Sequence, residues 1–221
     1  MKKKGNKLDI VIRNMYRRLD GYFGDLKWWP ARSRFEVIIG AILTQNTSWK
    51  NVEKAMKELR SRKLLTLKGM RIADRKSIQK AIRCTGYFRQ KTERLRGICE
   101  FLVSECGYDL KKGGLIDTDI FREKLLSLNG IGPETADSIL LYAFNRPVFV
   151  VDAYTMRVFE RHGLIGGKTQ YSDVQDMVHS ALGRDVQAFN QFHALIVEVG
   201  KRFCLKKAGK CGECPIKSLS L

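Results

Sequence analysis

The sequence lacks any run of about 18 apolar residues, so none of its segments is long enough to span a membrane as a helix. The opening residues MKKKGNK lead into the charged segment DIVIRNMYRRLD and not into the apolar core of a signal peptide. We therefore expect a cytoplasmic protein. Disulfides rarely persist in that compartment, so the six cysteines are expected to be buried thiols or metal ligands.

Acidic residues are scarce relative to basic ones. The chain has 23 Asp and Glu against 41 Lys and Arg, a formal charge of +18, with an isoelectric point near 9.8. A polyanionic partner is the simplest explanation, and the alternative is a basic surface without a specific partner.

Long linkers are also missing. No stretch rich in Ser, Pro or Gly separates two parts of the chain, although 221 residues allow one large domain or two small lobes. Any second lobe is therefore expected to share an interface with the first.

Apolar residues recur at helical spacing in nearly every segment, and alternating strand patterns are short and rare. Glycines such as Gly86, Gly107 and Gly163 lie where helices are expected to end. We predict about ten helices. Only VFVV, residues 148–151, has the composition of a strand, and that run is too short to decide.

The segment LNGIGPETADSIL, residues 128–140, has the features of a phosphate-binding turn between two helices. The preceding helix is expected over 119–126, and Pro133 suits the first turn of the next helix, where an N–H would be unpaired anyway. Gly130 and Gly132 allow backbone conformations that other residues avoid. Exposed amides beside a helix N-terminus form a phosphate site that does not depend on base sequence. An ordinary corner between helices is the alternative.

A second motif, VVDAYTMRV, places Asp152 directly before a helical stretch. An aspartate in that position often serves only as an N-cap. Taken alone, Asp152 is therefore explained by a structural role.

Together these segments resemble the helix-hairpin-helix DNA glycosylases of the endonuclease III family, and AILTQNTSWKNVEKA at 41–55 resembles the glutamine-bearing turn of that family. The resemblance covers about 35–214. It implies an all-α, two-lobed fold that flanks a cleft for double-stranded DNA. One lobe of six helices would span 26–146, with the helix-hairpin-helix at about 119–142, and the other would combine 1–25 with 147–221.

In this family a damaged base is rotated out of the duplex before its glycosidic bond is broken. By resemblance, Asp152 is the catalytic carboxylate, which stabilises positive charge on the sugar and activates water. Gln45 matches the residue that fills the vacated space. The residues predicted to contact DNA are Gln45, Asn129, Gly130, Ile131, Gly132, Lys206, Lys207 and Lys210.

The chain departs from the bifunctional members at Glu134. Those enzymes carry a lysine there, which forms a Schiff base with the sugar and permits strand cleavage. A carboxylate cannot form an imine. We therefore predict a monofunctional glycosylase without lyase activity.

The positions of the three tryptophans indicate which class of damaged base is the substrate. WWP at 28–30, LTQNTSW ending at Trp49, and Glu134 together resemble the 3-methyladenine DNA glycosylase III branch. An alkylated purine is positively charged and gains from stacking on indole faces. The predicted base pocket contains Glu134, Trp28, Trp29 and Trp49, and packing within a lobe is the alternative for each tryptophan.

Near the carboxyl end, Cys204, Cys211 and Cys214 are spaced as Cx6CxxC, which suits an iron–sulfur cluster. The family pattern has a fourth cysteine at position 220, where this chain has Ser220. We favour a 4Fe-4S cluster over zinc. Three interpretations stay open: serine supplies an oxygen ligand, an outside molecule supplies the fourth ligand, or the loop holds no stable cluster.

The remaining candidates receive no role. Cys84, Cys99 and Cys106 lack ligand spacing, and the three histidines share no metal spacing. By resemblance the protein is a monomer. Two alternatives remain, an endonuclease III-like enzyme acting on oxidised pyrimidines or mismatched bases, and a DNA-binding module without catalysis.

Overall fold

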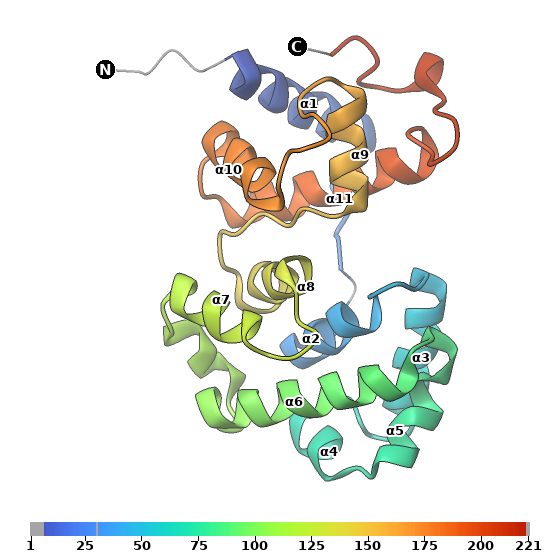
Figure 1. The fold of residues 1–221 in the computed structure, drawn as a ribbon, viewed down its shortest axis with the longest axis vertical. Helices are drawn as coiled ribbons and strands as arrows, with labels where there is room; N and C mark the ends of the chain where they lie inside the picture. The colour runs from blue at the N-terminus through green and yellow to red at the C-terminus, as the bar shows by residue number, and fades with distance from the viewer. Residues whose placement is uncertain (1–6, 30, 220–221) are drawn as a thin grey trace. The chain divides into compact units, whose positions relative to one another are not determined.

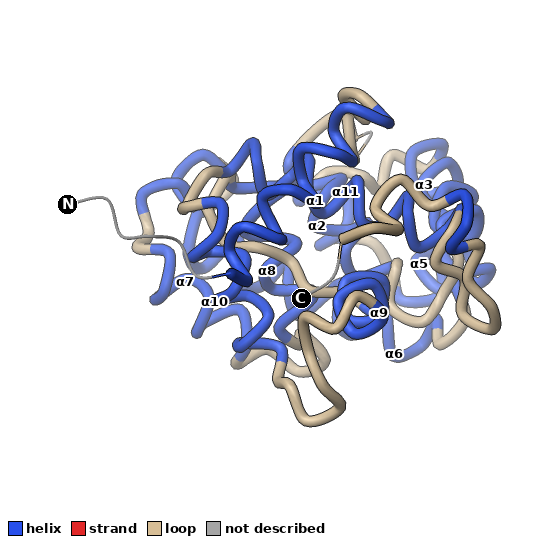
Figure 2. The backbone as a smooth tube through the Cα atoms, turned by 90° about the horizontal axis from the view of Figure 1, so that it is seen from above, coloured by secondary structure: helices blue, strands red, loops and turns tan. Residues whose placement is uncertain are grey.

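The computed structural model describes residues 7–29 and 31–219 and divides the chain into two compact units. The terminal unit combines Met1–Pro30 with Pro147–Leu221, and the central unit is Ala31–Arg146. Within the described residues every regular element is a helix, as Figures 1 and 2 show, so the predicted all-α fold is confirmed.

Four α-helices form the body of the terminal unit: α1 (Lys7–Phe23), α9 (Ala153–Arg161), α10 (Tyr171–Leu182) and α11 (Val186–Arg202). Helix α1 packs on α10 and α11, and α11 also packs on α9. Gly200 lets α9 approach α11 closely, because a Cβ there would lie 2.2 Å from Cδ1 of Tyr154. A short 3-10 turn, Cys211–Glu213, follows α11.

Seven α-helices form the described part of the central unit: α2 (Arg34–Leu43), α3 (Trp49–Ser61), α4 (Leu67–Ile72), α5 (Arg75–Ile82), α6 (Phe88–Cys106), α7 (Thr118–Leu126) and α8 (Pro133–Ser138). Helix α8 continues into a π-helical turn, Ile139–Ala143. Helix α2 is buried from Phe35 to Leu43 and packs on α3, α6, α8 and the π-helical turn. It is the centre of this unit's core.

Side-chain caps fix where many of these helices begin. Ser33, Thr66, Asp74, Asp117 and Asp185 each accept a hydrogen bond from a backbone N–H in the first turn of the helix that follows. Such caps satisfy amides that have no partner within the helix. The described helices include none with the length and apolar composition needed to cross a membrane.

The strand-like run VFVV is not a strand. Residues 148–151 are buried, and side chains satisfy their backbone groups instead of a neighbouring strand. Phe149 N–H donates to His179 Nε2 at 3.0 Å, and Phe149 O accepts from Gln175 Nε2 at 2.7 Å. Val151 N–H donates to the Tyr171 hydroxyl at 3.3 Å. With these partners, an apolar segment can stay buried without a sheet.

Candidate active site

Asp152 is the N-cap of α9, and its two carboxylate oxygens have different surroundings. Oδ1 accepts hydrogen bonds from Thr155 N at 2.8 Å and Thr155 Oγ1 at 2.9 Å. Oδ2 lies 3.6 Å from His193 Nε2, and the Asp152 side chain is only 13% exposed. Oδ1 therefore caps the helix, while Oδ2 accepts no hydrogen bond from that helix and is the oxygen that could act in catalysis. The structural role and a catalytic role are compatible.

The carboxyl group of Asp152 has a lowered pKa. Burial alone would raise it, but the interaction with His193, 3.6 Å away, together with the hydrogen bonds from Thr155, outweighs burial and brings the pKa below 3.8. At neutral pH the group is a carboxylate. It therefore carries the negative charge that a cationic sugar would require.

His193, on α11, had no role in the sequence interpretation, yet it faces the candidate catalytic carboxylate. Its side chain is 6% exposed. Its ring meets Trp28 edge-on, with centroids 6.2 Å apart, and Phe149 edge-on at 6.3 Å. No spacing in the sequence links His193 to Asp152, since only the packing of α11 on α9 brings them together.

Trp28 and Trp29 belong to the terminal unit. Trp28 is half-buried, and Lys201 Nζ lies 5.2 Å from the centroid of its ring system. Trp29 is half-buried with a backbone φ of 68°, in the left-handed region. Trp28 thus lies beside His193 within one unit, and its role in a base pocket stays a prediction.

In the central unit, the predicted hairpin lies between α7 and α8. Ile131 N–H donates to Leu128 O at 3.1 Å, and Pro133 is the first residue of α8, as predicted. Gly130 has a φ of 80°, and a Cβ there would lie 2.1 Å from Arg94 Nε. The expectation for Gly132 was wrong: its φ is −93°, which any residue adopts, and it serves as the N-cap of α8.

An ion pair joins the two helices of the hairpin. Arg122 on α7 donates to Asp137 on α8 through Nε at 2.7 Å and through Nη2 at 3.1 Å. Asp137 is fully buried. This bidentate pair joins α8 to α7.

Glu134 lies in the first turn of α8 and is exposed. A negative charge there is favourable to the helix, because the N-terminal amides carry partial positive charge. The structure thus offers a structural reason for an acid at position 134. A role in base recognition remains a prediction.

The side chain of Gln45 is held against the hairpin. Its Nε2 donates to Gly130 O at 3.0 Å and to Thr135 Oγ1 at 2.9 Å, while its Oε1 accepts from Arg94 Nη1 at 2.6 Å. All of the amide's polar atoms are therefore engaged. To fill a space in DNA, as predicted, Gln45 would have to exchange these bonds for contacts with bases.

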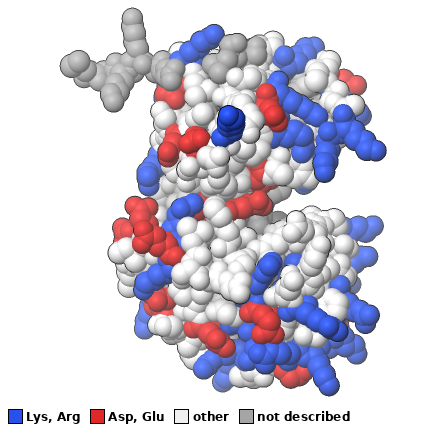
Figure 3. Space-filling view, in the orientation of Figure 1, with Lys and Arg blue, Asp and Glu red and all other residues white. Residues whose placement is uncertain are grey.

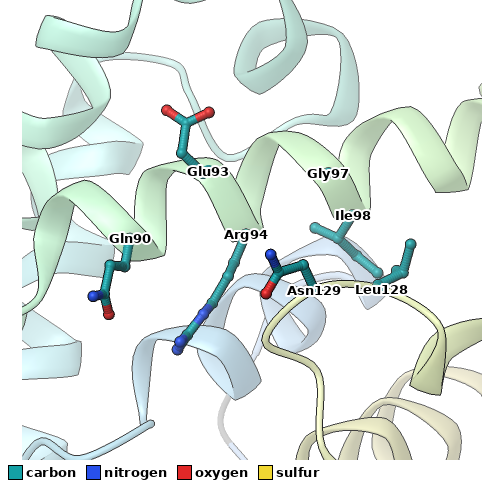
Figure 4. Close-up of a pocket in the computed structure, with 7 residues that line it drawn as sticks. All are labelled: Gln90, Glu93, Arg94, Gly97, Ile98, Leu128 and Asn129. Carbon is teal, nitrogen blue, oxygen red and sulfur yellow. The ribbon is translucent and has the colours of Figure 1, made fainter.

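A cavity of about 430 Å³ lies between α6 and the hairpin. Figure 4 shows the residues that line it, with Arg94 extending from α6 on the side of the helix where Asn129 lies. Asn129 therefore lines this cavity beside Leu128. The sequence did not identify Arg94, which donates to Gln45 and lies against Gly130 of the hairpin.

Trp49 is the first residue of α3 and is 36% exposed. Its Nε1 donates to Glu53 Oε1 at 3.0 Å. The indole therefore keeps a fixed orientation on the surface of the central unit. That geometry is compatible with stacking on a base.

The three predicted metal ligands line one cavity, of about 150 Å³, together with Arg161 and His162. Cys204 and Cys214 are buried and Cys211 is exposed. The described residues contain no group of three His, Cys, Asp or Glu side chains arranged to hold a single metal ion. Ser220 lies outside the described residues.

The basic residues of this loop are exposed. Lys206, Lys207 and Lys210 belong to the segment between α11 and the last 3-10 turn. In Figure 3, Lys and Arg side chains gather on the terminal unit over this segment. Among the cysteines without ligand spacing, Cys99 and Cys106 are buried, and Cys84 is exposed.

Comparison with known proteins gives a family match and a close relative in sequence. Residues 39–182 match the family model for the HhH-GPD superfamily base excision DNA repair protein. A Methanocaldococcus jannaschii protein with the name "Putative DNA repair glycosylase MJ1434" is 44% identical over 220 residues, 99% of each chain.

Two solved structures are also similar. The H. pylori 3-methyladenine DNA glycosylase MagIII, bound to 1,N6-ethenoadenine, has a TM-score of 0.76 and 26% identity, and the match covers 88% of this chain and 97% of that one. A non-covalent complex of endonuclease III with DNA has a TM-score of 0.81 at 21% identity, covering 96% and 94% of the two chains, and supports the fold.

Proposed function

Because this chain belongs to the HhH-GPD superfamily of base excision DNA repair proteins and is a DNA glycosylase, we propose that it is monofunctional and releases an alkylated purine such as 3-methyladenine. It acts on double-stranded DNA as a cytoplasmic monomer. In the reaction the bond from C1′ to the base nitrogen breaks, and the base takes the electron pair. Water then bonds to C1′ and loses a proton.

The surroundings of Asp152 carry this proposal. A carboxylate that is largely buried and ionised at neutral pH stabilises positive charge on the sugar more strongly than an exposed one. Oδ1 is occupied by Thr155, so Oδ2 is the oxygen that orients or deprotonates water. His193 holds the carboxylate in its ionised state.

The proposed absence of lyase activity rests on Glu134. A Schiff base needs an amine, and the side chain at the position of the family lysine is a carboxylate. The hairpin around it supports DNA binding through its backbone, including that of Ile131, whose side chain is buried. Gln45 and Asn129 contribute beside it. Lys206, Lys207 and Lys210 add phosphate contacts whose strength falls with salt.

The choice of an alkylated purine rests on charge and on the tryptophans. A purine methylated on a ring nitrogen is cationic, so it leaves without strong acid catalysis and stacks well on an indole face. Trp49 offers such a face, with Trp28 and Trp29 as further candidates. The likeness to a solved 3-methyladenine DNA glycosylase supports the same choice.

The thiols of Cys204, Cys211 and Cys214 support a 4Fe-4S cluster. They line one cavity, and Arg161 Nη1 lies 3.3 Å from Cys204 Sγ. Thiolate sulfurs are the usual ligands of iron–sulfur clusters. A cluster takes one ligand at each of four irons, so its ligands lie farther apart than those of one ion. The donor set therefore fits a cluster, which would hold the loop that carries the three lysines.

A panel of duplexes containing one lesion each tests the proposal. We expect release of methylated purine, strand breaks only after alkali, and no covalent adduct upon borohydride treatment. Release of oxidised pyrimidines or mismatched bases instead would favour the endonuclease III-like alternative. Adduct formation would contradict monofunctional action, and binding without release of any base would favour a binding module.

A further inference from the structure

His162 faces the cavity that the three cysteines line. It is the C-cap of α9 and directly follows Arg161, the last residue of that helix. In the chain it lies some forty residues before the cysteine segment. The cavity is also lined by Phe203, Lys217 and Leu219. The packing of α9 against the end of α11 therefore adds an imidazole to three thiols that the sequence already groups.

The orientation of the imidazole is fixed by a backbone contact. His162 Nδ1 forms a short hydrogen bond with Leu219 O, and because a carbonyl oxygen only accepts, Nδ1 carries the proton. In this tautomer of the neutral ring, Nε2 holds a lone pair. Histidine ligands of metals commonly donate their other N–H to a carbonyl or carboxylate in this way, which fixes the tautomer.

Arg161 supplies a second feature of a metal site. Its guanidinium lies against Cys204 Sγ and also donates to Leu205 O at 2.7 Å and to Lys206 O at 3.2 Å. These bonds hold the start of the cysteine loop on α9 at the point where His162 follows. Cys204 and His162 are therefore held close together, because Arg161 contacts the first and directly precedes the second.

We propose that His162, through Nε2, is the fourth ligand of a 4Fe-4S cluster bound by Cys204, Cys211 and Cys214. This inference rests on the cluster proposed above. It assigns a residue of the described structure as the fourth ligand, which the family pattern supplies from a cysteine at the position of Ser220. A neutral imidazole in place of a fourth thiolate makes the site less negative, so the cluster is easier to reduce.

The test uses the full chain purified without oxygen. Iron, sulfide and zinc are measured, and pulsed EPR on protein containing isotopically labelled histidine looks for nitrogen bound to the cluster. We expect a cluster with nitrogen coupling in the wild type. His162→Cys should keep the iron, lose the coupling and lower the reduction potential, whereas His162→Gln should lose most of the iron.

Two controls accompany these variants. Ser220→Ala should keep the wild-type iron content and nitrogen coupling, and so should His179→Gln, which changes a histidine outside the cavity. Circular dichroism checks that His162→Gln is folded. The nitrogen coupling and reduction potential of His162→Cys test the ligand even if His162→Gln fails to fold.

The outcomes separate the two proposals. Two outcomes would overturn the role of His162 without contradicting the proposal of a cluster. One is a cluster without nitrogen coupling, and the other is a loss of iron in Ser220→Ala equal to that in His162→Gln. Iron-free protein, or zinc in place of iron, would overturn both. Base release from alkylated DNA is measured on the same preparations and tests the glycosylase proposal independently.

Discussion

His193 Nε2 lies 3.6 Å from Asp152 Oδ2, and both side chains are largely buried in the terminal unit. The interaction with His193 lowers the pKa of Asp152, although burial of the carboxyl group alone would raise it. A carboxylate placed only to begin a helix needs no such partner. The relationship therefore distinguishes Asp152 from the other aspartate N-caps of this protein.

Asp152→Asn should abolish most base release while leaving the fold intact. Asparagine caps helices as well as aspartate does, but it cannot stabilise positive charge on the sugar. We expect release of methylated purine to fall by about a hundredfold or more, with little change in binding to undamaged DNA.

The matched control is Asp74→Asn, which changes the N-cap of α5. Its release rate should stay near the wild-type value. If the two variants lost activity equally, Asp152 would have only a structural role.

His193→Gln should change the pH dependence of base release. Removing the imidazole removes the largest of the interactions that lower the Asp152 pKa, and the hydrogen bonds from Thr155 alone oppose burial, so the pKa rises. The carboxylate is active when ionised, and its loss on acidification should therefore begin at higher pH than in the wild type. Single-turnover rates between about pH 4 and 8 measure this shift.

His179→Gln provides the comparison, because that ring accepts from Phe149 N–H. It should destabilise the protein without moving the acid limb. An unchanged acid limb in His193→Gln would remove His193 from the proposal.

Local chemistry made much of the helical fold predictable. Pro133 in the first turn of α8 and Asp152 as a cap act within a few residues of their own position, so the sequence alone contains the information. The VFVV segment shows the limit. Its backbone groups form hydrogen bonds with His179, Gln175 and Tyr171. All three belong to α10, which is separated from the segment by α9.

The partners of the candidate residues were not predictable for the same reason. Arg94 reaches Gln45 from α6, and His193 reaches Asp152 from α11. Neither pair has a spacing that marks it in the sequence. The roles assigned by resemblance stay predictions, because similarity identifies residue types at matched positions and not what they contact.

Trp49→Ala should lower release of methylated purine more than it lowers binding to undamaged DNA. The indole is 36% exposed and oriented by Glu53, so its loss removes a stacking surface without opening the core. Base stacking on an aromatic ring is worth about 1–3 kcal/mol, so roughly a tenfold loss in release is expected. Trp49→Phe should restore part of it. Equal losses in release and binding would contradict a role in the base pocket.

Arg94→Met should weaken both the hairpin and DNA binding. Arg94 donates to Gln45 Oε1, and its guanidinium packs against Gly130. Losing a charged hydrogen-bond donor there should lower the free energy of unfolding by about 1–3 kcal/mol and reduce affinity for duplex DNA. Arg89→Met removes the same charge from an exposed position on α6 and should affect salt-dependent binding only slightly. Similar effects in both variants would show that charge alone matters.

Lys91 gives the fold a measurable dependence on alkaline pH. The side chain is buried, and Nζ donates to Leu43 O and Thr85 O, each at 2.9 Å. Burial, followed by repulsion from Arg94, lowers its pKa from 10.5 to about 8. Between these two values the unfolded chain binds more protons than the folded one. The free energy of unfolding contributed by Lys91 therefore rises with pH across that window.

Lys91→Met should remove this rise and leave two carbonyls without their donor, which lowers stability by about 1–3 kcal/mol at neutral pH. Urea denaturation of both proteins at about pH 7 and pH 10 measures the effect. The difference in free energy of unfolding between wild type and variant should widen at the higher pH. Lys80→Met, an exposed change on α5, should show no such widening. A difference independent of pH would mean that Lys91 keeps its ordinary pKa in the folded protein.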